Sequence, residues 1–198
     1  MRRYAFIDVP NTTGTAKSVL NFSIDWAKLY DLLVNDKWSC SSVFFYRGNK
    51  GDKEREQLEK IGQLGYIVRT KLTHIHPDWY KELQINCPHC NSDFKYNELI
   101  RGNQKSNCDV ELTVDALETL KEGDEAMLFT ADGDFAYLIE KLLERKVGVR
   151  LVSSKNRDDA GKIRFSTRLT AMLEREEQGQ KRVQFIHLNN WKKKIEKP

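Results

Sequence analysis

The chain has 198 residues, of which 39% are hydrophobic and 10% aromatic, which is enough for one domain with a substantial core. This composition excludes an intrinsically disordered chain, and no apolar run approaches the roughly 20 residues that a membrane-spanning helix needs. The formal net charge is +4, and no long apolar leader follows the basic start Met1-Arg2-Arg3, so we expect a cytoplasmic protein without a signal peptide.

The first part of the chain alternates short apolar runs with helical patterns. The run Tyr4–Val9 is apolar except for Asp8, which predicts a buried strand that closes on a carboxylate. A charged stretch after residue 52 ends at Gly65, where a helix stop is expected. The predicted elements are a strand at 4–9, a helix at 24–34, a strand at 43–46, a helix at 52–64 and a strand at 66–69.

Regular alternation lapses over residues 73–104, which we interpret as an insertion in the domain. The segment is polar, holds two of the four prolines and contains the closely spaced pair Cys87 and Cys90. Its aromatic side chains suit stacking on nucleic-acid bases, although packing in a small core is the commoner role of such residues. These aromatics are Trp79, Tyr80, Phe94 and Tyr96.

Strands and helices alternate again after the insertion. A mainly parallel sheet covered by helices on both faces follows from this alternation, and we expect one three-layer α/β domain over residues 1–198. The predicted elements are a helix at 109–121, a strand at 126–130, a helix at 134–145, a strand at 147–152, a helix at 159–175, a strand at 183–186 and a basic tail at 181–198.

Charge is spread unevenly along the chain. Residues 1–140 hold 17 Lys and Arg against 22 Asp and Glu, whereas residues 141–198 hold 16 against 7. An acidic front and a basic back suit an enzyme with a carboxylate site and a polyanionic partner, although a solvated lysine-rich tail gives the same count. Arg150 and Lys155 are candidates to hold a phosphate backbone, in competition with an ordinary solvated role.

Acidic residues lie where the predicted strands and helices meet. Asp8 closes the first strand, and Asp109 opens a helix whose apolar face should pack on the sheet. Asp132 and Asp134 follow the strand that ends at Thr130. Ligands of open parallel sheets bind beyond the carboxyl ends of the strands, where the strand order reverses. We therefore expect these four carboxylates to share one edge of the sheet.

Clustered carboxylates repel one another unless a cation neutralises them. Hard Mg²⁺ or Mn²⁺, held by oxygen ligands and water, suits such a cluster better than zinc. We expect Gly133 to allow the sharp turn between two of the aspartates, because glycine tolerates unusual backbone angles. A lone Asp-Gly-Asp is more often a surface turn or helix cap. Asp8 needs another explanation, since a charge that ends a buried strand is costly without a partner.

The segment Cys87-Pro88-His89-Cys90 has the spacing of a zinc knuckle, but zinc needs four ligands and no second pair follows. We favour a turn with two free thiols over a Zn²⁺ site at Cys87 and Cys90. A cytosolic compartment also argues against a disulfide framework. The local candidates to complete a mixed site are His74, His76, His89 and Cys108.

Three motifs occur in order along the chain. They are FIDVPN at 6–11, KSNCDVEL at 105–112 with DAL at 115–117, and TADGDF at 130–135. Together they resemble the motifs of NYN domains, specifically the bacterial LabA-like branch of the PIN-like nucleases. The resemblance runs from residue 4 to about residue 153 and covers most of the chain.

The resemblance implies a central parallel sheet of strand order 3-2-1-4-5 and metal-dependent cleavage of RNA. In the family pattern, Asn11 and Thr130 match polar positions that orient metal-bound water or phosphate, and Lys105 is near enough to meet a phosphate. Asp115 lies about 120° round the helix from Asp109, which fits a peripheral or structural role. The implied catalytic and metal-binding set is Asp8, Asp109, Asp132 and Asp134.

Three hypotheses follow for the function. The first is a cytoplasmic ribonuclease that uses Mg²⁺ or Mn²⁺ to hydrolyse single-stranded RNA. The second is a catalytically weak or inactive RNA-binding or regulatory module of the same fold. The third is a phosphohydrolase of the haloacid dehalogenase type, which ranks last because it needs a second aspartate where Asp8-Val9-Pro10 has none. The sequence leaves the RNA substrate, the cleavage mode and the oligomeric state open, with a homodimer among the alternatives.

Overall fold

The computed structural model describes residues 1–36, 38–49, 51–75, 77–102, 104–105, 107–177, 180–181 and 183–198. Four short strands are described by their backbone alone: β4 (His74–Ile75), β7 (Gln104–Lys105), β10 (Glu176–Glu177) and β11 (Gln180–Lys181). β4 pairs with β7, and β10 pairs with β11, in antiparallel fashion.

A six-stranded sheet of order β12-β9-β8-β1-β2-β3 forms the centre of the molecule, and all of its neighbouring strands are parallel. Its first five strands in chain order have the predicted arrangement 3-2-1-4-5, and β12 adds a sixth strand at one edge. The strands are β1 (Arg3–Asp8), β2 (Ser42–Asn49), β3 (Ile67–Leu72), β8 (Glu125–Phe129), β9 (Gly148–Ser153) and β12 (Val183–His187).

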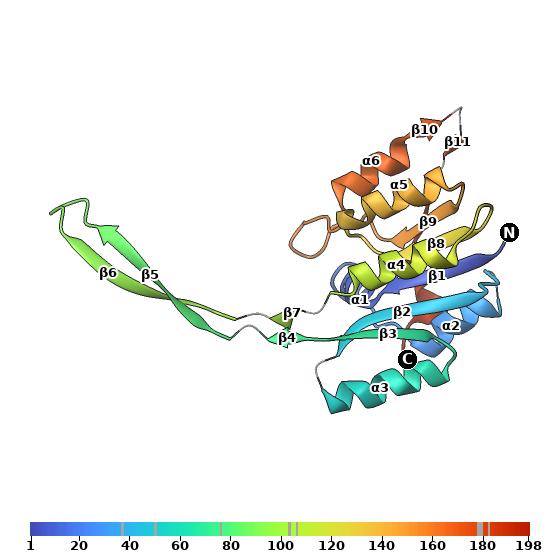
Figure 1. Ribbon diagram of the computed structural model, residues 1–198, viewed down its shortest axis with the longest axis horizontal. Helices are drawn as coiled ribbons and strands as arrows, with labels where there is room; N and C mark the ends of the chain where they lie inside the picture. The colour runs from blue at the N-terminus through green and yellow to red at the C-terminus, as the bar shows by residue number, and fades with distance from the viewer. Residues whose placement is uncertain are drawn as a thin grey trace.

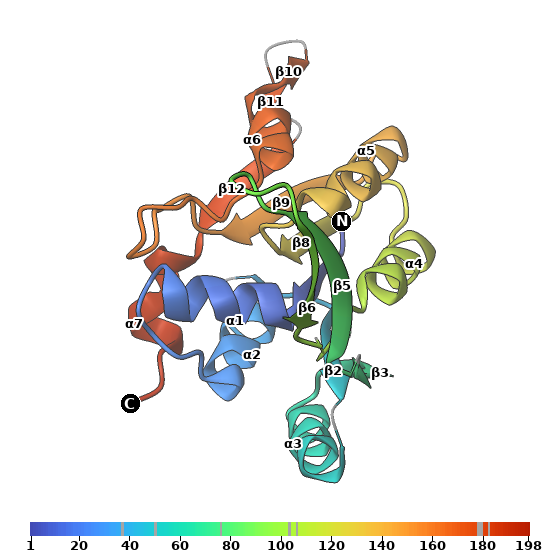
Figure 2. The ribbon, with the colours of Figure 1, turned by 90° about the vertical axis from the view of Figure 1, so that its left-hand side faces the viewer.

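Helices cover both faces of this sheet, as predicted, and Figure 2 shows the two groups on opposite sides. Side chains alternate across β1, so Tyr4 and Phe6 belong to one buried cluster while Ala5 and Ile7 belong to the other. The first face packs against α4 (Asp109–Thr119), α5 (Ala136–Glu144) and α6 (Thr167–Glu174). The second face packs against α1 (Val9–Ser18), α2 (Trp26–Val34), α3 (Asp52–Gln63) and α7 (Lys192–Ile195).

Helix α1 begins immediately after β1, where the sequence predicted the end of a strand and no helix. Asp8 is in extended conformation and caps the helix, because its side chain accepts a hydrogen bond from the Asn11 backbone N–H. Pro10 is in the first turn, where its missing N–H costs nothing. Only Val9 and a few small residues of this helix are buried, so its sequence carries a weak apolar pattern.

The last large helix is shorter than predicted. We expected a helix at 159–175, but α6 begins at Thr167 with Ser166 as its cap, whose hydroxyl accepts from the Arg168 N–H. The preceding residues form a loop around Asp158, whose carboxylate accepts from the backbone N–H groups of Ala160 and Lys162. An aspartate that satisfies loop amides in this way competes with helix formation.

The predicted insertion contains a long antiparallel hairpin of β5 (Trp79–Asn86) and β6 (Asp93–Ile100). This hairpin and its flanks, residues 77–102, are called the arm below. Figure 1 shows the arm extending away from the sheet, with its turn at the end farthest from the domain. Most of its side chains are exposed to solvent.

The segment predicted as a basic tail also contains regular structure. Residues 183–187 form β12 at the sheet edge, followed by the 3₁₀ turn η2 (Leu188–Trp191) and α7. Leu188, Trp191 and Ile195 are buried in the same cluster as Leu29 and Leu33 of α2. The lysines of this segment remain on its outer side, whereas its apolar side chains are in the core. Its lysine-rich sequence therefore predicted a basic tail.

Candidate active site

The carboxyl ends of β1 and β8 meet at the point where the strand order reverses. The chain proceeds from β1 to β2 and β3 in one direction and from β8 to β9 and β12 in the other. In the register of the two central strands Ile7 is opposite Phe129, which places Asp8 beside Thr130. Such a reversal point leaves a crevice between the loops that follow the two strands.

Hydrogen bonds between these two loops fix the Asp8 carboxylate. One oxygen of Asp8 accepts from the Asn11 N–H at 3.3 Å, and the other accepts from the Thr130 hydroxyl at 3.2 Å. The Asn11 side-chain oxygen accepts from the Ala131 N–H at 2.9 Å. Asn11 and Thr130, which the family resemblance associated with water or phosphate, therefore also tie β1 to β8 and orient Asp8.

Asp132 and Asp134 are held by a tight turn after β8. The Asp132 N–H donates to the Thr130 hydroxyl oxygen at 3.1 Å, and the Asp132 carboxylate accepts from the Asp134 N–H at 3.0 Å. This turn is the 3₁₀ segment η1 (Gly133–Phe135), which leads directly into α5. Phe135 is buried beneath it, which anchors the start of the helix.

Gly133 is needed here for a reason that differs from the predicted one. We expected unusual backbone angles, but Gly133 is not among the glycines with positive φ. A Cβ atom at this position would instead collide with the hydroxyl of Ser166, the residue that caps α6. The Ser166 N–H also donates to the Ala131 carbonyl at 3.0 Å, so the α6 end packs closely on the acidic turn.

Asp109, the first residue of α4, reaches the same place from a third part of the chain. The carboxylate of Asp109 accepts from the Asn107 side-chain amide at 2.6 Å, and the Asn107 oxygen accepts from the Asp109 N–H at 2.9 Å. One carboxylate oxygen from each of Asp109, Asp132 and Asp134 lies within 4.8 Å of the others. This oxygen-only set has the chemistry that a hard divalent cation prefers.

Asp8 stands next to this set but outside the group of three. Burial raises the pKa of Asp8 to about 6 against the opposing hydrogen bonds from Asn11 and Thr130, and the nearby charges of Asp109 and Asp132 raise it further. Burial, together with Asp132 and Asp134, also raises the pKa of Asp109. Among the residues that the structure describes, none of these four carboxylates forms an ion pair. The cluster is therefore short of positive charge.

Three of the four aspartates, Asp8, Asp109 and Asp132, border a cavity of about 290 Å³ that Tyr46 and Arg47 also line. A second cavity of about 650 Å³ shares Pro10, Arg47 and Gly48 with the first. Lys17 and Lys197 line this second cavity. The sequence did not identify Arg47 or Lys17 as site residues, because only the pairing of β1 with β2 brings the end of β2 next to Asp8.

The other predicted substrate-binding residues lie elsewhere or make other contacts. Lys155 follows β9 at the correct edge, but its ammonium group lies 5.0 Å from the ring centre of Phe185 and 5.6 Å from that of Phe165. The Lys105 side chain lies outside the described part of the chain. Cys87 and Cys90 lie in the turn between β5 and β6, which Figure 1 shows at the end of the arm farthest from the sheet.

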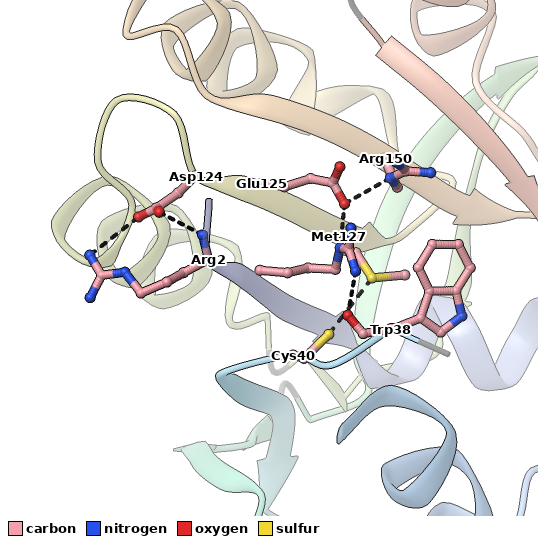
Figure 3. A network of polar contacts seen from close by, with 8 residues as sticks. Arg2, Trp38, Cys40, Asp124, Glu125, Met127 and Arg150 are labelled. Atoms are coloured by element: carbon pink, nitrogen blue, oxygen red, sulfur yellow. Dashed lines mark hydrogen bonds and ion pairs between the residues drawn. The ribbon is translucent and has the colours of Figure 1, made fainter. Parts of the chain in front are cut away.

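Arg150 points toward the amino-terminal ends of the strands, so the structure does not bring it to the aspartates at the carboxyl-terminal ends. It is the third residue of β9, and its Nε lies 2.8 Å from the carboxylate of Glu125 at the start of β8 (Figure 3). Arg3 pairs with the same carboxylate, and both guanidinium groups lie 5.4 Å from the Trp38 ring centre. Burial alone would raise the pKa of Glu125, but the bonds from Arg150 and Arg3 hold it below its ordinary value.

Comparison with known proteins identifies relatives of this chain. The family model described as NYN domain matches residues 3–172. The Low amplitude and bright protein LabA of Synechococcus elongatus is 28% identical over 114 residues, which are 57% of this chain and 52% of that protein. The match thus spans about half the length of this curated relative.

A crystal structure of a protein of unknown function from Vibrio parahaemolyticus superposes with a TM-score of 0.52 at 20% identity. The superposition covers 76% of this chain and 80% of the other. At this identity the similarity supports the fold alone. None of the helices within the described residues is both long and apolar enough to cross a membrane.

Proposed function

The chain belongs to the NYN domain family, and we propose that it is a metal-dependent ribonuclease that hydrolyses the phosphodiester bonds of RNA. NYN domains are PIN-like domains that bind RNA and are generally nucleases. One observation carries the proposal. Three sequence-distant segments bring Asp109, Asp132 and Asp134 together beside Asp8, and no cation of the described residues pairs with them.

Mg²⁺ or Mn²⁺ fits this donor set, because both ions prefer carboxylate oxygens and keep several water ligands. Asp109, Asp132 and Asp134 would hold the ion, with Asp8 at its side. When bound, such an ion lowers the pKa of a water ligand and stabilises negative charge that develops on phosphate.

The residues of the chain itself position the reacting groups. We assign Asp8 to the orientation of the attacking water, because its carboxylate is fixed by Thr130 and Asn11 and faces the cavity. Asn11 and Thr130 hold the two loops in register, so a change at either residue should misplace Asp8 relative to Asp132. Misplacement by about 1 Å is enough to slow a positioned reaction by roughly 100-fold.

The two cavities share Pro10, Arg47 and Gly48 in their linings, and we propose that the RNA backbone runs along them. Arg47 lines both cavities, and Lys17 and Lys197 line the second one. Phosphate contacts of this kind provide affinity without selecting a sequence. We propose single-stranded RNA as the substrate, since a flexible single strand can bring one phosphate into a cavity of about 290 Å³ more easily than a stiff duplex.

The test is cleavage of a labelled single-stranded RNA by the native protein and by Asp132→Asn, over a series of Mg²⁺ and Mn²⁺ concentrations. We expect cleavage only with a divalent ion, and a loss of at least about 100-fold in the variant. Asp52→Asn, a change of an exposed carboxylate at the start of α3, is the matched control and should cleave like the native protein. Equal activity of the native protein and Asp132→Asn would exclude the catalytic assignment.

A gel-shift measurement on the same samples separates the ribonuclease from an inactive RNA-binding module of the same fold. Asp132→Asn should still bind RNA, because the proposed phosphate contacts come from Arg47, Lys17 and Lys197. RNA binding by the native protein without cleavage at any Mg²⁺ or Mn²⁺ concentration would favour the inactive module.

A further inference from the structure

The arm has a turn that the ribonuclease proposal does not use. Cys87-Pro88-His89-Cys90 connects β5 to β6 at the tip of the arm, and Figure 1 shows this tip far from the sheet. Both cysteines are free thiols, Cys90 is exposed and Cys87 is half-buried. The other two cysteines of the chain, Cys40 and Cys108, are buried within the domain.

Backbone hydrogen bonds fold this turn into a defined shape. The Asn91 N–H donates to the Cys87 carbonyl at 2.9 Å, and the Cys87 N–H donates to the Ser92 carbonyl at 2.9 Å. Asn91 has a φ of 56°, a left-handed conformation that asparagine tolerates better than most residues. The Asn86 side chain donates to the Asn91 carbonyl at 3.2 Å. The Cys90 thiol donates to the Ser92 hydroxyl at 3.4 Å, so the same ordered turn holds both cysteines.

Two thiols that are separated by two residues on one ordered turn supply half of the ligands of a four-coordinate zinc site. Structural zinc takes four ligands in tetrahedral arrangement, commonly Cys pairs separated by two residues. Among the described residues, the only group of three or more metal-ligating side chains is formed by Asp109, Asp132 and Asp134. No further His, Cys or carboxylate of the described chain joins Cys87 and Cys90, so two ligands have to come from another molecule.

We propose that Cys87 and Cys90 bind Zn²⁺ together with the same two cysteines of a second copy of the chain, so that two arms are joined tip to tip by one four-thiolate site. The position of the turn permits this arrangement, because the arm holds it clear of the domain. Zinc–thiolate binding releases enough free energy to order small structures on its own.

The surface next to the turn suits another copy of the arm. In the hairpin register one face carries three apolar pairs and one charged pair: Trp79 with Ile100, Lys81 with Glu98, Leu83 with Tyr96, and Ile85 with Phe94. Trp79, Phe94 and Tyr96 are each at least half exposed, although an isolated two-stranded hairpin is marginally stable in water. Ile85 is opposite Phe94, and this is the apolar pair nearest the turn. A shared zinc ion would bring these pairs of the two copies together and cover them.

The charge of the arm disfavours RNA as its partner. Residues 77–102 carry three cations against four carboxylates, whereas a surface that holds a polyanion should be basic. The cations are Lys81, Lys95 and Arg101, and the carboxylates are Asp78, Glu82, Asp93 and Glu98. The exposed aromatics are therefore better explained by contact with a protein surface of the same kind than by stacking on bases.

The experiment is a titration of the reduced, metal-free protein with ZnCl₂, followed by chromatography with light scattering and by measurement of bound zinc. We expect one zinc ion for every two chains and a shift from monomer to dimer that a chelator reverses. The double variant Cys87→Ser with Cys90→Ser should stay monomeric and bind no zinc at the arm. Its thermal unfolding should match that of the native monomer, because the arm packs outside both core clusters.

Two further variants make the result specific. Asp132→Asn should keep the zinc-dependent dimer, which shows that the aspartate cluster is not the zinc site under study. His89→Ala should also keep it, because the proposed site uses thiolates alone. One zinc ion per monomer, a dimer that persists in the double cysteine variant, or no zinc binding at all would overturn the proposal. The proposal does not rest on the ribonuclease assignment, and RNA cleavage by the double cysteine variant tests that assignment separately.

Discussion

The two ends of the strands in the central sheet hold acidic residues in opposite electrostatic settings. We call the side of the sheet with the amino-terminal strand ends the amino edge and the side with the carboxyl-terminal strand ends the carboxyl edge. At the amino edge, Glu125 is buried between Arg3 and Arg150, and Asp124 accepts from the Arg2 backbone N–H at 3.1 Å (Figure 3). At the carboxyl edge, Asp109, Asp132 and Asp134 converge with no ion pair among the described residues. The fold thus neutralises one acidic group with its own arginines, whereas the other has no cation partner among the described residues.

This difference separates charges that the chain neutralises itself from those of the proposed metal site. A buried carboxylate with two guanidinium partners is satisfied within the chain, and its pKa lies below the ordinary value. The carboxylates of Asp8 and Asp109 have raised pKa values, because burial and their acidic neighbours disfavour their charged form. Repulsion of this kind is retained where a cation or a reaction needs it.

The largest expected effect comes from giving the carboxyl edge a cation of its own. In Asp134→Lys an exposed ligand becomes an ammonium group that can pair with Asp109 and Asp132. RNA cleavage should fall by about 1,000-fold or more, since one ligand is lost and the ion is repelled. The thermal midpoint should also stop responding to Mn²⁺. Asp134→Asn is the control: it should retain some Mn²⁺ response, and full activity of Asp134→Lys would contradict the proposed site.

The amino edge should respond in stability and not in catalysis. Glu125→Gln leaves Arg3 and Arg150 without their shared carboxylate in a buried position, which should lower the free energy of unfolding by about 3–5 kcal/mol. Urea denaturation measures this loss. RNA cleavage per folded molecule should stay at the native rate when assayed well below the melting temperature.

An exposed pair supplies the control for that measurement. Glu122 pairs with Lys146, and both side chains are about 70% exposed. Glu122→Gln should therefore change the free energy of unfolding by less than about 1 kcal/mol. If Glu125→Gln and Glu122→Gln lowered the free energy of unfolding by similar amounts, burial of the ion pairs around Glu125 would contribute nothing to stability.

Asp8→Asn should stabilise the protein in the absence of metal. Asp8 has a pKa of about 6 in the folded state against an ordinary 3.8, so its ionisation above pH 6 opposes folding. Removal of the charge should raise the free energy of unfolding by about 3 kcal/mol at pH 8. The gain should shrink as pH falls through 6 and be nearly absent below pH 4. Urea denaturation over this pH range measures the gain in the free energy of unfolding. A gain that does not change with pH would show that it does not come from the Asp8 charge.

The smallest effect should come from the proposed phosphate contact. Arg47→Gln removes a cation between the two cavities, and we expect RNA affinity to fall only a few-fold, about 1 kcal/mol or less. The slope of log affinity against log salt should become shallower by about 1. Arg2→Gln removes an exposed arginine at the amino edge and is the matched control. An equal loss in both variants would place the RNA elsewhere.

Much of the sheet could be predicted because parallel strands covered on both faces consist of nearly continuous apolar residues. All five residues of β8 are buried, and its sequence is correspondingly easy to recognise. Helix α1 was not predicted, since Asp8 capping and a few small buried residues define it. The pairing of strands within the arm could not be predicted either, because neither face of the hairpin packs on the domain. Its sequence therefore lacks the alternation of buried and exposed residues that would indicate the register.

The convergence of Asp8, Asp109, Asp132 and Asp134 could be expected from their positions at strand and helix ends, and their catalytic role stays a prediction. Asp115 also matches its expected structural role, since it accepts bonds from Tyr46 and Arg69. The assignment of Arg150 to the substrate neglected strand polarity. A residue near the start of a parallel strand faces the amino edge, and the predicted range of 147–152 already contained that information.

The packing of α7 on α2 has a consequence for biosynthesis. Ile195 accepts a hydrogen bond from the Asp25 N–H at 2.7 Å and is buried in one cluster with Leu29 and Leu33. At translation rates of about 5–20 residues per second, α2 leaves the ribosome roughly 10–30 s before residue 195 is made. During that interval the apolar face of α2 lacks the cover that α7 provides in the folded protein.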